Sequence, residues 1–154
     1  TMMESAYADA QFAVVPIDDE LIPIVFISSS KLMDAKFSEV RLWRSIYHEG
    51  FHFYQYSTGR CPDAVWSVHQ SAEESDAAMT LPAITCWFEA EIEAHKRDCI
   101  APFGEEWNEI RNYRYCRALQ HAGDRGLRRY LAALLATQPK FAKQAAELRA
   151  LAEK

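Results

Sequence analysis

Strand-like sequence is confined to the first third of this chain, and this limits the fold more than any other feature. Two segments there, QFAVVPI and ELIPIVFISS, are rich in the Val, Ile and Phe residues that favour strands. Pro16 and Pro23 restrict them to short or edge strands, because proline has no N–H to donate to a neighbouring strand. A small sheet or hairpin is therefore expected near the N-terminus.

The middle of the chain reads as helical. A helix is expected over residues 38–56, with the run Ser-Thr-Gly that follows as its stop. Residues 60–66 have no clear period and predict a loop that leads into a short helical turn around residues 69–79. A longer helix begins near Thr80, tolerates Pro82 in its first turn, and runs through Cys99.

Three further helical patterns fill the C-terminal third, over residues 105–121, 127–137 and 140–154. Glycines and a proline separate them. The predicted fold class is α+β and mostly helical, with short N-terminal strands or a hairpin, then a helix over residues 38–56 and about four further helices.

Length and charge narrow the class of protein. At 154 residues the chain is expected to form a single domain over residues 1–154. A net charge of −5 argues against a nucleic-acid partner, because phosphate binding needs clustered Lys and Arg. No apolar run approaches the ~18 residues that span a bilayer, so we expect no membrane partner and a soluble chain.

The compartment and the oligomeric state are left open by the sequence. The N-terminal segment TMMESAYADAQ lacks the layout of a signal peptide, and a cytoplasmic location is slightly favoured over export with a removed signal. The four cysteines have no C-x-x-C pair, which leaves free thiols or two disulfides. Free thiols are favoured, because Cys86, Cys99 and Cys116 fall in helical patterns that suit a small apolar residue.

The segment YHEGFHFYQY carries the clearest chemical signal. At ~100° per residue, His52 lies about 40° from His48 on a helical wheel, on a side shared with other polar residues, among them Gln55. The opposite side holds Leu42, Trp43, Ile46, Gly50, Phe53 and Tyr54. The wheel therefore predicts that the histidines line a cleft and that the opposite side faces the core, with Gly50 allowing a close approach.

Two histidines at this spacing suit a metal ion. Both imidazoles can reach one zinc ion at ~2.0 to 2.1 Å, and Glu49 on the adjacent flank can reach a water molecule on that ion. Neutral imidazole is a ligand that zinc accepts readily. The sequence therefore predicts a Zn²⁺ site with His48 and His52 as ligands and Glu49 as a base.

The run His48-Glu49-Gly50-Phe51-His52 resembles the H-E-x-x-H motif of the zincin metallopeptidases, and the resemblance covers one helix. It implies a zinc-dependent hydrolase in which Glu49 activates metal-bound water to cleave a peptide or protein substrate. It also implies that residues 22–27 form the strand along which the substrate lies. The chain is short for such an enzyme, so a minimal or truncated member is expected.

A catalytic zinc site needs a third protein ligand. No histidine follows closely in FYQYSTGRCPD, which excludes the metzincin branch and leaves the gluzincin branch, where a later glutamate binds zinc. On the helix that begins near Thr80, Glu91 shares a face with Trp87 and Phe88, where a carboxylate is costly to bury without a partner such as zinc. Glu89 and Glu93 fall on the opposite, solvated face.

The resemblance to the gluzincin pattern E-x-x-A-D supports the same choice. It implies that Glu91 is the ligand and that His95 stands where the family has a supporting aspartate. Because histidine replaces that aspartate, Asp98 one turn later is an alternative supporting residue. Glu73, Glu74 and His69 remain open as rival third ligands.

Other roles also stay open. Tyr113, Tyr115 and His121 are candidates to stabilise an oxyanion, although such residues more often pack in a core or rim. Glu49-x-x-His52 also matches half of a di-iron carboxylate site, but the second copy that such a site needs is absent. A catalytically inactive zincin-like domain, kept for metal binding or protein interaction, is the alternative function.

Overall fold

The computed structural model describes residues 9–34, 38–69 and 71–154 of the chain. The segment 1–8, which was expected to lack a signal peptide, lies outside these described residues. The chain divides into two compact units, Thr1–Ala90 and Glu91–Lys154. The boundary falls inside helix α5, Leu81–Ile100, so one helix belongs to both units, and the single domain stays a prediction.

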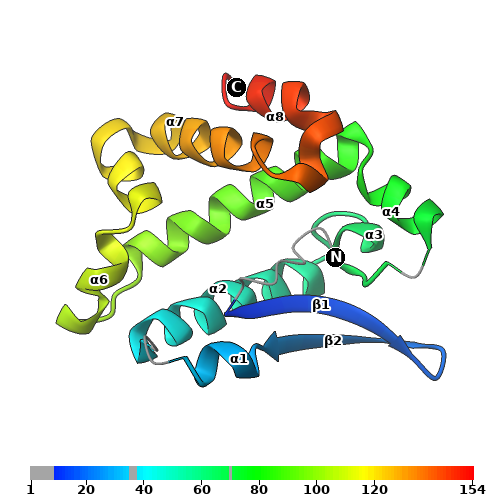
Figure 1. Cartoon of the computed structure of the whole chain (residues 1–154), viewed down its shortest axis with the longest axis horizontal. Coiled ribbons are helices and arrows are strands. Elements are labelled where there is room, and N and C mark those ends of the chain that lie inside the picture. Colours follow the sequence, from blue (N-terminus) through cyan, green and yellow to red (C-terminus); the bar gives the residue numbers. More distant parts are fainter. Residues whose placement is uncertain (1–8, 35–37, 70) are drawn as a thin grey trace. The chain divides into compact units, whose positions relative to one another are not determined.

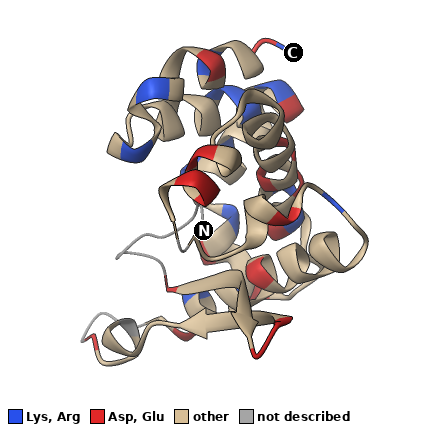
Figure 2. Cartoon of the chain, turned by 90° about the vertical axis from the view of Figure 1, so that its right-hand side faces the viewer, with Lys and Arg blue, Asp and Glu red and all other residues tan. Residues whose placement is uncertain are grey.

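The first unit begins with the predicted hairpin (Figure 1). Strand β1, Ala10–Ile17, pairs antiparallel with β2, Glu20–Ile27. Asp18 and Asp19 form the connecting turn with φ values of 47° and 65°. Two-residue hairpin turns of this kind need positive φ at both positions, which Asp tolerates better than most residues. The turn is the acidic tip of the hairpin in Figure 2.

The two prolines fit the hairpin because of their register. Along a strand, successive N–H groups point to opposite edges. The N–H of Phe12 points away from β2, since it donates to the side chain of Glu49. Pro16 and Val14 are an even number of residues from Phe12, so their backbone nitrogens also point away from β2. Pro23 is the register partner of Val14, so its nitrogen points away from β1. Neither proline therefore removes a hydrogen bond between the two strands.

Helix α2, Glu39–Ser57, follows the short helix α1, Ser29–Leu32, and confirms the helix expected over residues 38–56. Ser38 caps its N-terminus, with Oγ accepting from the backbone N of Arg41 at 3.2 Å. At the other end Gly59 takes a φ of 79°, the left-handed conformation in which helices commonly stop. This helix contacts both strands of the hairpin.

The remainder of the first unit consists of short helices that lead into α5 (Figure 1). Helix α3, Asp63–Trp66, occupies part of the expected loop over residues 60–66, and α4, Ala72–Ala78, is the predicted helical turn. Helix α5 begins one residue after Thr80 and confirms the long helix predicted there. The parallel bridge between Val14 and Ser67 attaches this segment to the outer edge of β1.

All four cysteines are paired, so the expectation of free thiols was wrong. Cys61 bonds to Cys86 within the first unit, and Cys99 bonds to Cys116 within the second. Their Cα atoms are 5.6 and 5.3 Å apart, which suits a disulfide. Helical periodicity misled the prediction, because a cysteine on a helix meets its partner through tertiary packing.

The second unit is helical throughout its described elements. After α5 come η1, Glu105–Trp107, and α6, Asn108–Arg111, followed by α7, Arg114–Ala136, then η2, Pro139–Gln144, and α8, Ala145–Leu151. Helix α8 packs on α7. The fully buried side chains there include Ile110, Cys116, Leu127, Phe141 and Leu148.

One helix in this unit is divided where no break was predicted, and one predicted break is present. The helix expected over residues 105–121 is divided at Asn112 and Tyr113 into α6 and α7. The break expected after residue 121 is confirmed, because Ala122 and Gly123 have non-helical backbone angles, with a φ of 62° and a ψ of −156° at Gly123, and divide α7 into two helical segments. A glycine adopts this backbone conformation far more easily than other residues, so the chain can turn here between the two helical segments.

Charged residues of the C-terminal helices pair with one another. Arg125 and Arg129 lie 3.6 and 3.1 Å from the carboxylate of Glu153. The Arg129 guanidinium, through its hydrogen bond and its charge, lowers the pKa of Glu153 below its ordinary value. These arginines are therefore part of a charged surface. No helix in the described part of the chain is long and apolar enough to cross a membrane.

Candidate metal centre

The polar side of α2 that carries the histidines is buried, and most of the side predicted to face the core is exposed, with Leu42 and Ile46 half-buried. His48, His52 and Gln55 are each 2% exposed, whereas Trp43 and Tyr54 are each 57% exposed. The wheel was wrong about the faces because it assigned apolar residues to the interior without knowing the partners of the polar ones. Those partners come from β1 and α5, which supply backbone hydrogen-bonding groups.

The predicted role of Gly50 was also wrong. Gly50 is exposed, and a Cβ atom placed there would meet no other atom within 4 Å. No neighbouring element therefore requires a glycine at this position of the motif.

The two histidines stand together as the motif predicted. Their Nε2 atoms are 3.1 Å apart, and their rings meet edge to face with centroids 4.7 Å apart. Two nitrogen ligands at ~2.0 to 2.1 Å from one tetrahedral zinc ion lie about 3.3 Å apart. The spacing of His48 and His52 thus matches what two ligands of one zinc ion require.

Glu49 lies beside the histidine pair. One carboxylate oxygen is within 4.8 Å of a ring nitrogen of each histidine, so the three residues form a cluster that can hold a metal ion. Its Oε2 atom accepts a hydrogen bond of 2.6 Å from the backbone N of Phe12 in β1. The strand that touches the motif through this bond is therefore β1, whereas the substrate strand was expected over residues 22–27, in β2.

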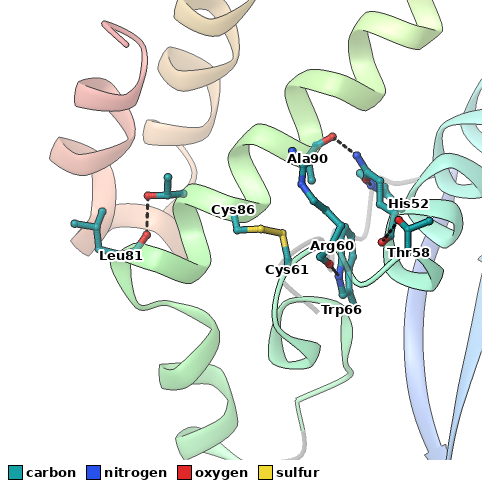
Figure 3. The surroundings of a disulfide bond; sticks show 10 residues. His52, Thr58, Arg60, Cys61, Trp66, Leu81, Cys86 and Ala90 are labelled. Carbon is teal, nitrogen blue, oxygen red and sulfur yellow. Dashed lines mark hydrogen bonds between the residues drawn. A yellow bond between two sulfur atoms is a disulfide. The ribbon is translucent and has the colours of Figure 1, made fainter.

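Gln55 is a site residue to which the sequence assigned no role. Its Oε1 atom is 2.7 Å from Nδ1 of His52, and its Nε2 atom donates to the carbonyl of Ala90 in α5 at 3.1 Å. The only signal in the sequence was its place on the same side of the helix as the histidines. The ring of Trp66 packs against the imidazole of His52, with the two centroids 5.4 Å apart (Figure 3).

Glu91 is the first residue of the second unit and is buried, as predicted, at 3% exposure. Its Oε2 atom is 3.3 Å from Nε2 of His95, and Nδ1 of His95 is 3.6 Å from the carboxylate of Asp98. His95 thus lies between the carboxylates of Glu91 and Asp98, and the supporting roles of His95 and Asp98 stay predictions. The approach of Glu91 to the histidines of α2 stays a prediction.

The rival third ligands have surroundings of their own. Glu73 and Glu74 are exposed in the first turn of α4. His69 is half-buried, and its Nε2 atom is 3.0 Å from the carbonyl oxygen of Ala64. Among the described residues, none of the three joins a cluster that can hold a metal ion. The structure gives no support to these alternatives.

The candidate oxyanion residues all belong to the second unit. Tyr115 packs against the ring of His95 with centroids 4.6 Å apart, and Tyr113 packs against Tyr115. His121 is exposed on α7. Their catalytic role stays a prediction.

Comparison of the chain with protein-family models, with curated proteins and with solved structures found no match. The assignment of a function therefore rests on the residues of the site themselves.

Proposed function

We propose that this protein is a zinc-dependent metallopeptidase-like hydrolase that cleaves a peptide bond in a peptide or protein substrate. The proposed zinc ligands are His48, His52 and Glu91, and the proposed general base is Glu49. The observation that carries the proposal is the 3.1 Å separation of the two Nε2 atoms in a buried cluster with a carboxylate. A buried pair of imidazoles beside a carboxylate fits a divalent cation by its donor set.

The choice of Glu91 rests on burial and on chain connectivity. Ala90 accepts the hydrogen bond from Gln55, and Glu91 is the next residue of the same helix. A buried carboxylate needs compensation for lost hydration, which a metal ion supplies. His95, whose Nε2 atom is 3.3 Å from Glu91, is proposed to hold that carboxylate in place.

In the proposed reaction, Glu49 accepts a proton from the water molecule that attacks the scissile carbonyl carbon, and later donates it to the leaving amine nitrogen. A zinc ion bound at the site would lower the pKa of that water and polarise the carbonyl. The N–H of Phe12 fixes the orientation of the Glu49 carboxylate by holding Oε2. The geometry of the base is thus set by β1.

Metal analysis and peptide cleavage test this proposal together. Purified wild type is expected to contain stoichiometric zinc and to cleave a mixed peptide substrate. Glu49→Gln should keep the zinc and lose cleavage, whereas His52→Ala and Glu91→Ala should lose both. Glu73→Ala and Glu74→Ala serve as matched controls, because they remove exposed carboxylates of the same unit as the motif, and both should behave as wild type.

Two results would overturn different parts of the proposal. Wild type without stoichiometric zinc would refute the metal site as a whole. A Glu91→Ala variant that retains zinc fully would refute only the third ligand.

A second candidate function is a zincin-like module that binds metal or another protein without cleaving a substrate. The observation that favours it is the bond between Glu49 and the backbone of Phe12, which gives the motif carboxylate a structural role. Zinc-loaded wild type that cleaves no peptide, and is indistinguishable from Glu49→Gln, would select this candidate.

We also propose that the protein works in an oxidising compartment. The chain has two disulfides. Disulfides are common in exported proteins and rare in the cytosol, where thiols are kept reduced. This reverses the slight preference for the cytoplasm that the sequence suggested. Alkylation of intact cells before lysis is expected to leave all four cysteines unmodified, and alkylated cysteines would contradict the proposal.

A further inference from the structure

We propose that Gln55 is a positioning residue that determines which ring nitrogen of His52 carries the proton. Gln55 is 2% exposed and stands three residues after His52 in α2. Its amide bridges two groups, the imidazole of His52 and the backbone carbonyl of Ala90. Figure 3 shows the contact between α2 and α5 on this side of the helix.

The orientation of the Gln55 amide follows from its partner in α5. The carbonyl oxygen of Ala90 only accepts hydrogen bonds, so the amide group that faces it at 3.1 Å must be the NH₂ donor. The reversed amide would place two acceptor oxygens at that distance. Oε1 of Gln55 therefore faces His52.

The proton on His52 follows from the amide. Oε1 accepts but does not donate, and it lies 2.7 Å from Nδ1, so Nδ1 of His52 must carry the hydrogen. In a neutral imidazole this leaves a lone pair on Nε2. That atom lies 3.1 Å from Nε2 of His48. The protein thus presents from His52 the electron pair that a metal ion requires.

The Cys61–Cys86 disulfide holds this arrangement in place. Cys86 stands one helical turn before Ala90 in α5, and Cys61 follows Arg60, whose carbonyl accepts a hydrogen bond of 2.6 Å from the indole of Trp66. The Trp66 ring in turn packs on His52. The disulfide is therefore linked to the imidazole of His52 in two ways: through Ala90 and Gln55, and through Trp66 (Figure 3).

The tautomer is tested by nuclear magnetic resonance on chelator-treated, ¹⁵N-histidine-labelled protein. We expect His52 of wild type to show a protonated Nδ1 and an unprotonated Nε2. Gln55→Leu removes the acceptor for Nδ1–H and should shift His52 toward the Nε2–H form. Ser45→Ala is the matched control, because Ser45 is a buried polar residue of α2 whose hydroxyl bonds to Arg41 and Asp9.

A second readout is zinc affinity, and this part rests on the zinc site proposed above. Residues that orient a metal-binding histidine typically contribute 10- to 100-fold in affinity, so Gln55→Leu should weaken zinc binding by roughly that factor. Thermal unfolding of each variant separates this effect from a loss of fold.

The two proposals fail in different ways. An Nε2–H tautomer of His52 in metal-free wild type would overturn the role of Gln55 without the need for any variant. So would a Gln55→Leu protein that keeps the Nδ1–H tautomer. If wild type shows the Nδ1–H form but binds no zinc, the role of Gln55 stands and the zinc site is refuted.

Discussion

The carboxylate of Glu49 accepts a hydrogen bond from the backbone N–H of Phe12, with 2.6 Å between Glu49 Oε2 and Phe12 N. The bond joins the central part of α2 to the first half of β1, across 37 residues of sequence. It gives the motif glutamate a part in stability that is separate from any part in catalysis.

The stability role of Glu49 is tested by two substitutions. Glu49→Leu leaves the buried N–H of Phe12 without its acceptor and should lower the free energy of unfolding by about 1–3 kcal/mol. Glu49→Gln retains an acceptor oxygen and should lose less. Urea denaturation of metal-free protein measures both. Equal stability of the two variants would contradict a role for the hydrogen bond.

Removal of either disulfide should destabilise the protein, by about 3 kcal/mol for loops of this length. The pairs close sequence separations of 25 and 17 residues. The double variant Cys61→Ala with Cys86→Ala should in addition weaken zinc retention, because it frees α5 from the segment that follows α2. The matched control is Cys99→Ala with Cys116→Ala, and thiol titration of the unfolded wild type should find no free thiol.

Two glycine substitutions should have opposite effects. Gly50→Ala adds a methyl group at an exposed helical position where no atom lies within 4 Å, so it should stabilise α2 by about 0.5–1 kcal/mol. Gly126→Ala places a Cβ atom 2.5 Å from the carbonyl oxygen of Ala118 and 2.7 Å from Cβ of Ala122, so it should destabilise α7 by about 1–3 kcal/mol. Thermal unfolding measures both. A destabilised Gly50→Ala protein would show that the glycine of the motif has a packing role.

The packing of α8 on α7 is tested at Leu148. This side chain is fully buried, so Leu148→Ala should leave a cavity and cost about 2–5 kcal/mol of unfolding free energy. Leu134 on α7 is 45% exposed, and Leu134→Ala should cost less than about 1 kcal/mol. Similar losses in the two variants would mean that the C-terminal helix does not contribute to the core.

Local sequence was enough to predict the secondary structure around the site. The hairpin, the helix that carries His48 and the burial of Glu91 all follow from patterns within a few residues, such as β-branched runs, capping residues and helical periodicity. The spacing of four residues between His48 and His52 also brings two imidazoles together in any helix.

What the sequence did not reveal is which side of α2 faces inward. Periodicity alone places Trp43 inside and Gln55 outside, and the reverse is observed. Burial of a polar side chain becomes acceptable only when tertiary contacts supply its hydrogen bonds, and the N–H of Phe12 and the carbonyl of Ala90 do so here. The disulfides have the same origin, because each needs two distant cysteines to be brought within bonding distance. The sequence by itself determined the two strands, most of the helices and the residue types of the site, since these depend largely on neighbours along the chain. Only the tertiary structure decided their burial, their hydrogen-bond partners and the pairing of the cysteines, since these depend on neighbours in space.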